Sequence, residues 1–367
     1  MKQTPLMVDS HEDIAWNMLT FGRDYRLSAQ ETRQKEAGSI IPRENGDTML
    51  GMPEYRAASM AVIFSTLFAA PFRTKEGDWD ILTYKDSQEA HRMYMDQVDA
   101  YERLTQENPS LFRTIKDKEA LSGLIHEHQS AKTSEKKPPI GLIYLMEGAD
   151  GIREPRETEE WFERGVRIFG LAWHGTRYSG GTREPGPLTM EGMELVRQIE
   201  GLGGILDISH MDEQAVRQTF DRYHGAIIAS HSNPFALVST RPSNRFLSDD
   251  VIIQLAERGG VIGIIPYNLF LDANWVKGDP KEDVSIAVYV EHIDHVCQLL
   301  GSADHVGIGT DFDGGFGLQC APAELNTLAD MGCIIPLLEK KGYTQSEIDK
   351  IFGLNWIEYM KKYLPEK

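Results

Sequence analysis

The first residues that could do chemistry are His11 and Asp13, which follow the short apolar run 6–8. Residues two apart in an extended chain project to the same side, so this imidazole and this carboxylate could bind one cation. A polar pair after a strand could equally cap a helix. The spacing therefore indicates a metal site only if further ligands gather at the same place.

Further ligand-type side chains follow other apolar runs of the chain. Glu147 follows the run 140–146, His210 follows 205–209 and His231 follows 226–230. Together with the first pair they supply three imidazoles and two carboxylates, a set that suits a borderline cation such as Zn²⁺. A single catalytic zinc uses three protein ligands and keeps one position open. The set therefore predicts two divalent ions, zinc in our interpretation, that share one carboxylate.

The elements that must position these residues alternate along the chain. Short apolar or β-branched runs, typical of buried strands, occupy 6–8, 61–67, 140–146, 168–173, 205–209, 226–230, 261–266 and 306–310. Helical segments include 86–107, 189–202, 251–258 and a C-terminal helix that a capping box opens at 344–347. Strands that alternate with helices predict a parallel sheet, and eight such units predict an α/β fold, a (β/α)₈ TIM-type barrel with extra C-terminal helices.

We expect the chain to form a single barrel domain over residues 1–367. The segment 17–59 has weak periodicity and several Gly and Pro residues, so we expect an N-terminal insertion over the barrel mouth, which could serve as a lid. Active sites of such barrels lie at the carboxyl ends of the strands, where the ligand set would gather. His305 precedes the last strand and would lie at the opposite mouth. The histidines outside the strand exits are expected on the surface, at 91, 126, 128, 224, 292 and 295.

Composition excludes several classes of partner. Lys and Arg total 38 against 56 for Asp and Glu, and the net charge of −18 repels nucleic acid and anionic membranes. Three cysteines are too few for a disulfide scaffold, and the N-terminus has no apolar signal region. The longest apolar stretch, 60–72, is shorter than the roughly 20 residues that cross a bilayer. We therefore expect a cytoplasmic protein that acts on a small molecule.

Five motifs in order resemble the membrane (renal) dipeptidase family of binuclear zinc peptidases. They are Asp9-Ser10-His11-Glu12-Asp13, Glu147-Gly148, Asp207-Ile208-Ser209-His210, Ser230-His231-Ser232 and His305-Val306-Gly307-Ile308-Gly309-Thr310-Asp311-Phe312-Asp313-Gly314. A late Gly353-Leu354-Asn355 element also matches. The resemblance implies a (β/α)₈ barrel, commonly a homodimer, that hydrolyses dipeptides and some related amides.

The resemblance also implies roles for particular residues. The first zinc would be held by His11, Asp13 and Glu147, and the second by Glu147, His210 and His231. A hydroxide between the two metals would be the nucleophile, because coordination lowers the pKa of water. Asp311 would move the proton between that water and the leaving amine. Arg245, rather than Arg241 four residues earlier, would receive the C-terminal carboxylate of the substrate, and Tyr267 would contact the substrate.

The chain departs from the family pattern at three places. Glu12 stands where the family has Asn or Cys, and Phe246 stands where the family has Asn, so we expect a different substrate pocket. At the fourth strand exit the family has a histidine that would polarise the scissile carbonyl. Strict alignment places Trp173 there, and His174 follows by one residue, which would turn it to the other face of an extended chain. His174 is the candidate for this catalytic and substrate-binding role, and Trp173 stays open as the residue that faces the site.

Three functions fit these residues. The first is a metallopeptidase that hydrolyses dipeptides with a free C-terminal carboxylate. The second keeps the barrel and the metals but hydrolyses cyclic amides, lactones or phosphoesters, which would not need the cation of Arg245. The third is a metal-bound protein that only binds a ligand, which would not need the carboxylate of Asp311. Asp207 inside the fifth strand is expected to orient a metal ligand through a hydrogen bond.

Overall fold

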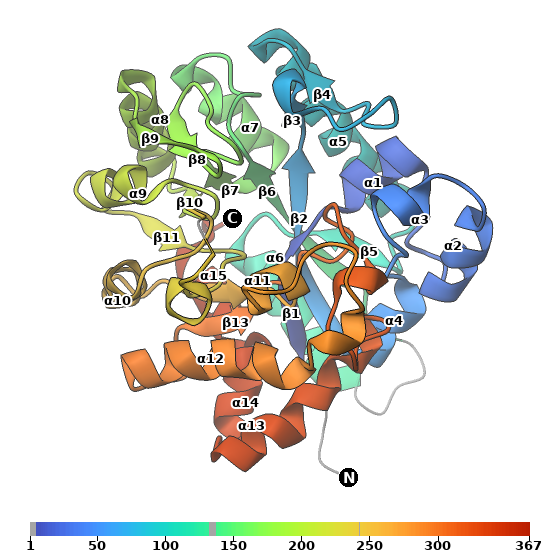
Figure 1. Ribbon diagram of the computed structural model, residues 1–367. Coiled ribbons are helices and arrows are strands. Elements are labelled where there is room, and N and C mark those ends of the chain that lie inside the picture. Colours follow the sequence, from blue (N-terminus) through green and yellow to red (C-terminus); the bar gives the residue numbers. More distant parts are fainter. Residues whose placement is uncertain (1–4, 132–136, 242) are drawn as a thin grey trace.

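The computed structural model describes residues 5–131, 137–241 and 243–367 (Figure 1). Eight parallel strands follow one another in the order β11-β10-β7-β6-β2-β1-β13-β12. They are β1 (Met7–Glu12), β2 (Met60–Phe68), β6 (Ile140–Glu147), β7 (Val166–Gly170), β10 (Ile205–Asp207), β11 (Ala226–Ile228), β12 (Ile262–Ile264) and β13 (Val306–Ile308). A parallel bridge between Ala229 and Ile262 joins the two ends of this order. The sheet is therefore a nearly closed TIM-type barrel, and each strand falls on a run that the sequence predicts.

The barrel strands are apolar on both faces because both faces are buried. Along β6, Ile143 and Leu145 belong to one buried cluster, whereas Leu142 and Tyr144 belong to another. The first cluster also contains Trp356 from the C-terminal helix, whose ring lies 5.2 Å from that of Phe64. This cluster fills the barrel interior, and the alternation that places Ile143 and Leu145 inside also places Glu147 on the inner face at the carboxyl end.

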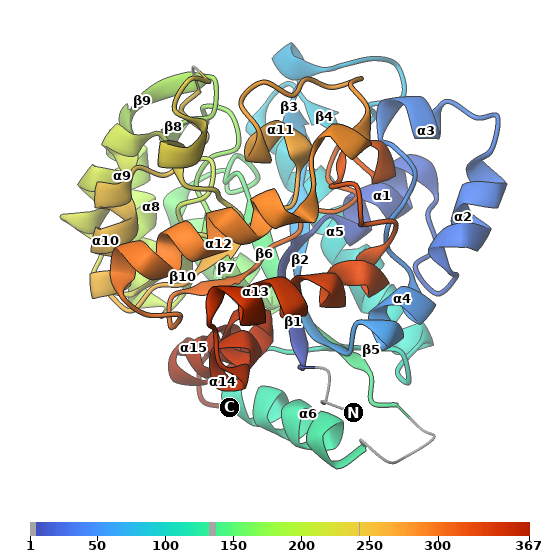
Figure 2. The same cartoon turned by 60° about the horizontal axis from the view of Figure 1, so that its bottom comes forward.

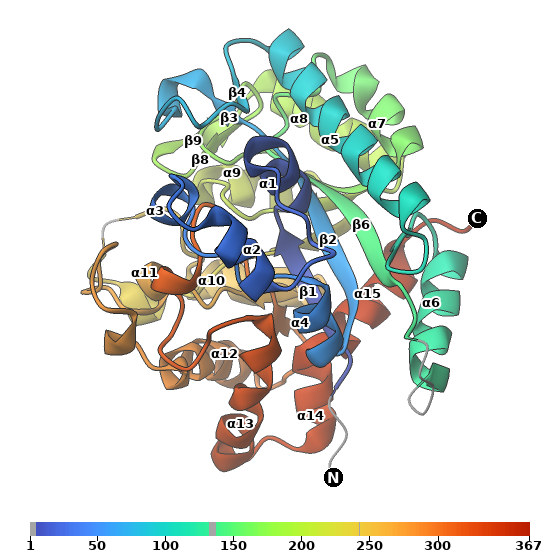
Figure 3. The same ribbon diagram turned by 90° about the vertical axis from the view of Figure 1, so that its right-hand side faces the viewer.

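Helices and short strands surround the barrel. The helices are α1 (Ile14–Phe21), α2 (Ala29–Glu36), α3 (Ile41–Glu44), α4 (Met52–Ala57), α5 (Ser87–Glu107), α6 (Lys118–Ser130), α7 (Thr158–Arg164), α8 (Met190–Gly201), α9 (Glu213–Phe220), α10 (Asp249–Glu257), α11 (Asn268–Leu271), α12 (Ile286–Leu300), α13 (Ile335–Lys341), α14 (Gln345–Asp349) and α15 (Asn355–Tyr363). Figure 3 shows α5 and α6 beside β2 and β6, and Figure 2 shows α12 and α13 across another side. Within the described residues, no helix is long and apolar enough to span a membrane.

Several short strands lie outside the predicted set. β5 (Phe112–Thr114) pairs with β6 as a ninth strand of the main sheet. Two small sheets lie outside the main sheet. In one, β3 (Ala70–Pro71) pairs with β4 (Thr83–Tyr84). In the other, β8 (Ser179–Gly181) pairs with β9 (Glu184–Leu188) as an antiparallel hairpin. These strands are two to five residues long, too short for a periodic pattern to reveal them.

The C-terminal segment is helical, as the capping box predicts, but it is not one helix. The Thr344 hydroxyl accepts from the backbone N–H of Glu347, and the Glu347 carboxylate accepts in return from Thr344. α14 then passes through a π-helical turn, Lys350–Leu354, into α15. The Asn355 side chain at the start of α15 donates to the carbonyls of Ala303 and Val306, at 2.6 and 2.7 Å. The Gly-x-Asn element therefore ties α15 to the start of β13.

His292 is a correction to the expected surface histidines. It lies in α12 with 0% exposure, and its Nε2 lies 3.2 Å from the Leu271 carbonyl. Burial lowers the pKa of His292 to about 4, so the ring is neutral near pH 7. His305 does lie at the amino end of β13, as expected, and its Nδ1 lies 2.8 Å from the Gly260 carbonyl.

The segment 17–59 is anchored to the loop that follows β13. The buried Asp313 carboxylate accepts from the Met49 backbone N–H at 2.9 Å and from the Tyr25 hydroxyl at 3.1 Å. Arg23 is also buried and lies between two carboxylates, 3.1 Å from Asp313 and 2.9 Å from Glu36 in α2. These contacts join the segment to the carboxyl end of the barrel, while its role as a lid stays a prediction.

Removal of Arg23 should destabilise the fold strongly. Arg23→Ala leaves two buried carboxylates without their cation, which typically costs about 3–5 kcal/mol of unfolding free energy. The matched control is Arg26→Ala, because Arg26 pairs with Asp24 at the surface, where an ion pair contributes about 0–1 kcal/mol. Urea denaturation of both variants measures the difference. Equal losses in the two variants would show that the buried pair does not anchor the segment.

Candidate active site

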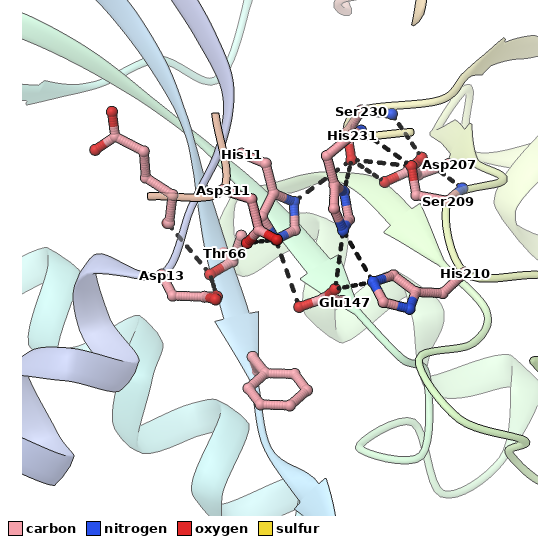
Figure 4. Close-up of polar contacts among 12 residues, drawn as sticks. His11, Asp13, Thr66, Glu147, Asp207, Ser209, His210, Ser230, His231 and Asp311 are labelled. Carbon is pink, nitrogen blue, oxygen red and sulfur yellow. Dashed lines mark hydrogen bonds and ion pairs between the residues drawn. The ribbon is translucent and has the colours of Figure 1, made fainter. Parts of the chain in front are cut away.

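Most of the predicted site residues meet at the carboxyl end of the barrel (Figure 4). His11 lies within β1, whose ladder to β2 has an irregularity between Asp9 and Glu12, and Glu147 ends β6. His210, His231 and Asp311 each come three residues after the end of their strand. His210 and Asp311 have positive φ angles of 65° and 56°, a backbone conformation that residues other than glycine rarely adopt. Strained backbone at these two exits is typical of functional turns.

Glu147 lies at the centre of the three imidazoles and uses its two oxygens differently. Its Oε2 lies 3.5 Å from Nε2 of His11. Its Oε1 lies 3.2 Å from Nε2 of His210 and 3.3 Å from Nε2 of His231. His11 therefore contacts one oxygen of Glu147 and the other two imidazoles contact the other oxygen, while the His11 and His231 rings lie 3.6 Å apart. A carboxylate with ligands on both of its oxygens could bridge two cations.

Asp13 and Asp311 complete the side of the site near His11. Asp311 Oδ1 lies 3.9 Å from Nε2 of His11, and Asp13 accepts a hydrogen bond from the hydroxyl of Thr66 in β2. His11, Asp13 and Asp311 each offer an atom within 4.8 Å of the others, as a metal site requires. A Cβ on Gly314 would lie 2.1 Å from Asp311 Oδ1 and 2.9 Å from Asp13 Oδ2, so only glycine leaves room for both carboxylates.

The charges of the site set the protonation of the histidines. Burial lowers the pKa of His210 to about 3 and that of His231 well below its usual value, so both rings are neutral and can act as ligands. For His11, burial is outweighed by the charges of Glu147, Asp311 and Asp13, which raise its pKa to about 10. Burial likewise opposes the ionisation of Glu147, but the three imidazoles hold its pKa well below the usual range.

The residues fit divalent metal ions. His11 Nε2 is buried and has no hydrogen-bond partner among the described residues, although it points at Glu147. His210 Nε2 and His231 Nε2 lie only 3.0 Å apart, and both also face the Glu147 carboxylate. The buried carboxylates of Glu147 and Asp13 and the half-buried carboxylate of Asp311 come together, and buried carboxylates require cations. A cluster of imidazole nitrogens and carboxylate oxygens is the donor set of zinc-type ions.

Burial sets the pKa of Asp311 as well. Burial and the neighbouring carboxylates of Asp13 and Glu147 raise the pKa of Asp311 well above its usual value, although His11 and Arg245 oppose the rise. A carboxyl group with a raised pKa can hold a proton near neutral pH. The geometry therefore brings an acid–base group beside the predicted metal ligands.

Arg245 lies at the other side of the site and is buried, with 4% exposure. Two of its guanidinium nitrogens donate to the Ser232 hydroxyl at 3.1 Å and to the His231 carbonyl at 2.8 Å. Its Nε has no partner among the described residues. Burial lowers its pKa to about 10, so the guanidinium stays charged at neutral pH. Arg241, by contrast, donates to the carbonyls of Asp272, Ala273 and Trp275, which is a structural role.

Tyr267 packs against aromatic side chains that follow the last strands of the barrel. Its ring stacks on Phe316, with centroids 4.1 Å apart and planes 6° apart. Phe316 also lines a cavity of about 490 Å³ between the 42–46, 277–282 and 316–320 segments. Burial, followed by the charges of Cys320 and Asp311, raises the pKa of Tyr267 above its usual value, so its hydroxyl keeps its proton.

The chain that follows β7 places Trp173, not His174, beside the imidazole of His210. The Trp173 ring lies 6.3 Å from that of His210 and 5.0 Å from that of Phe68. His174 stacks on Trp173 at 4.2 Å, and its charged neighbours are Arg183, Glu184 and Arg73 rather than the predicted metal ligands. The ring contact of His174 is therefore with Trp173, and its ring lies among charged residues of the neighbouring loops.

Sequence reasoning missed several polar residues that hold the predicted ligands. Thr66 donates to Asp13, Thr182 lies 3.0 Å from Nδ1 of His210, and the Ser230 hydroxyl lies 2.8 Å from Nδ1 of His231. Ser230 immediately precedes a predicted ligand and was the one residue of this group that a motif marked. Thr66 is the sixth residue of a long apolar run, and its position on the inner face of β2 was the available signal.

The sequence matches a known family over nearly its whole length. The sequence profile of the membrane dipeptidase family, peptidase family M19, matches residues 1–363. The curated relatives include an uncharacterised protein in the pqqA 5′ region of Klebsiella pneumoniae, 33% identical over 60% of this chain and 82% of the relative. They also include dipeptidase ataJ of Aspergillus terreus, 27% identical over 76% of this chain and 70% of the relative. The aligned regions of two further relatives span about half of their length, 53% and 51%.

Solved structures share the fold. A metallo peptidase from Rhodobacter sphaeroides, liganded with a phosphinate mimic of the dipeptide L-Ala-D-Ala, superposes with a TM-score of 0.78. The alignment covers 98% of this chain and 100% of that chain at 20% identity. At this identity the likeness establishes the barrel alone.

Proposed function

This chain belongs to the membrane dipeptidase family, a family of metallopeptidases, and from this premise we propose that it hydrolyses dipeptides with a free C-terminal carboxylate at a centre of two zinc ions. The single observation that carries this proposal is the geometry of Glu147, whose two oxygens face separate groups of imidazoles. One buried carboxylate between two ligand groups is the arrangement that two ions need and one ion does not.

Each ion would have its own ligands on this chain. His11 and Asp13 would hold the first ion and His210 and His231 the second, with Glu147 shared between them. When bound, two such ions lower the pKa of a water molecule toward neutrality and polarise the scissile carbonyl. Thr66 occupies one oxygen of Asp13 with a hydrogen bond, so it fixes the orientation of that ligand and leaves the other oxygen for the ion.

Asp311 is proposed to move the proton. Its carboxyl group lies beside His11, and its raised pKa lets it take a proton from the attacking water and give that proton to the leaving amine. The backbone N–H of Asp311 donates to the His11 carbonyl at 3.2 Å, which fixes the loop relative to β1. A protein that only bound a ligand would have no use for this group, so we favour an enzyme over a binding protein.

Arg245 is proposed to bind the C-terminal carboxylate of the substrate. The guanidinium is buried, charged and only partly used by the protein, and the unpartnered Nε–H is a donor that a carboxylate could satisfy. Guanidinium and carboxylate pair through two parallel hydrogen bonds. A cyclic amide or lactone has no such carboxylate, so the buried cation favours the dipeptide over those alternatives.

A cytoplasmic location, a homodimer and a single domain over residues 1–367 stay predictions.

The Arg245→Ala variant should lose activity only on substrates with a free C-terminus. Loss of a charge-assisted contact typically removes about 1.5–3 kcal/mol, which lowers kcat/KM roughly 10- to 150-fold at about 1.4 kcal/mol per decade. Ala-Ala and its C-terminal amide, assayed with both enzymes, form the test. The amide should be a poor substrate for wild type and little affected by the substitution. Equal hydrolysis of acid and amide by wild type would instead favour the cyclic-amide or lactone reading.

Trp173→Ala and His174→Ala test which residue after β7 acts in the site. We expect Trp173→Ala to lower kcat because its ring packs beside His210, whereas His174→Ala should have the smaller effect because it lies behind that ring. Asp311→Asn serves as the reference and should lose roughly 10²-fold or more while it retains metal. Steady-state kinetics together with metal analysis of each variant separates chemistry from metal loss. A large kcat loss in His174→Ala alone, with metal intact, would restore His174 to the catalytic role.

A further inference from the structure

Each imidazole of the site turns its Nδ1 toward a hydroxyl group. Nδ1 of His210 lies 3.0 Å from the Thr182 hydroxyl. Nδ1 of His231 lies 2.8 Å from the Ser230 hydroxyl, and Nδ1 of His11 lies 3.4 Å from the same oxygen. The Thr182 hydroxyl thus contacts one imidazole. The Ser230 hydroxyl contacts two, which face opposite oxygens of Glu147 (Figure 4).

The Ser230 hydroxyl has one proton, and the buried Asp207 determines where it goes. Asp207 Oδ2 lies 2.5 Å from the Ser230 oxygen, and Asp207 is 1% exposed. Asp207 Oδ1 accepts from the backbone N–H groups of Ser209 and Ser230, at 3.0 and 2.9 Å, which fixes the carboxylate in place. The Ser230 hydroxyl donates its proton to Asp207 Oδ2. The Ser230 oxygen is then left as an acceptor toward both rings.

This arrangement decides which ring nitrogens face the metal positions. A ring whose Nδ1–H donates to Ser230 presents the lone pair of Nε2, and Nε2 is the atom that both rings direct at Glu147. If Ser230 donated to a ring instead, that ring would carry its proton on Nε2 and could not bind a cation there. Hydrogen bonds of this kind fix the tautomer and orientation of metal-binding histidines.

We propose that Ser230, oriented by Asp207, is a positioning residue that keeps a proton on Nδ1 of both His11 and His231, so that Nε2 of each ring is the atom left for one of the two metal ions. The inference rests on the proposed function, which assigns these two histidines to different ions. The Ser230 hydroxyl thereby contacts the Nδ1 atoms of both histidines, while the Glu147 carboxylate faces their Nε2 atoms. The Thr182 hydroxyl contacts His210 alone among the three imidazoles, so it prepares a single metal position.

Metal affinity distinguishes the shared hydroxyl from the single one. Zinc binding to metal-free enzyme, measured by competition with a chelator, gives the two dissociation constants without any activity assay. Ser230→Ala should lower the affinity for both ions about 10- to 100-fold, which is the usual effect when a metal ligand loses its hydrogen-bond partner. Thr182→Val should weaken one ion only. Ser10→Ala is the matched control, because the buried Ser10 hydroxyl donates to the backbone carbonyls of Ser230 and Ile308 and not to the rings, and it should change little.

Imidazole nitrogen NMR tests the tautomer itself and needs no metal. In metal-free wild type labelled with ¹⁵N-histidine, His231 should carry its proton on Nδ1. Asp207→Asn, which preserves the shape of the carboxylate but can donate a hydrogen bond to Ser230, should shift the His231 proton toward Nε2 and weaken both ions. An unchanged tautomer in Asp207→Asn, or loss of a single ion in Ser230→Ala, would overturn the proposal. If wild type bound fewer than two zinc ions, that result would contradict the proposed function instead. The NMR result would still decide the role of Asp207.

Discussion

The burial of the Glu147 carboxylate among three imidazoles is the constraint on which the site depends. A buried carboxylate is costly unless cations or hydrogen bonds compensate it, and here Asp13 and Asp311 add further negative charge close by. Arg245 is a buried cation that lies at one side of the site and donates to the His231 carbonyl. The barrel places Glu147 at the end of β6, where its two oxygens face residues from opposite walls, and divalent ions would supply the missing charge.

The loops at the carboxyl end of the barrel have strained backbone at three residues. His210, Asp311 and Asp313 all have positive φ angles, and the first two lie in the site. Strained backbone persists only where the surroundings hold it. Asp313 is held by Tyr25, Thr48 and Met49, and Arg23 adds a buried cation. The 17–59 segment therefore supports the loop that carries Asp311, so stability of the fold and geometry of the site depend on the same buried contacts.

Much of the fold and of the candidate ligand set could be predicted from the sequence because both follow from short-range patterns. Buried parallel strands read as continuous apolar runs, and the residues after them must gather at one end of a barrel, which identified Glu147, His210 and His231. Contacts between distant segments left no such pattern. Thr182 lies in a loop and contacts His210, which is 28 residues away along the chain. Arg23 also lies in a loop, and it contacts Asp313, which is 290 residues away. His292 was misassigned because one polar residue on a helix does not reveal what packs over it. The strand-4 exit needed the structure because β7 ends at Gly170 and an irregular chain follows it, where the alternation of faces no longer applies.

The most direct test of the central claim is anomalous X-ray scattering at the zinc edge from crystals of enzyme reconstituted with Zn²⁺. Our account predicts two peaks on either side of the Glu147 carboxylate, roughly 3.5–4 Å apart as in other two-metal sites. One peak should lie beside His11 and Asp13, and the other beside His210 and His231. A single peak at full occupancy, or a Glu147 carboxylate bound to one ion only, would contradict the account.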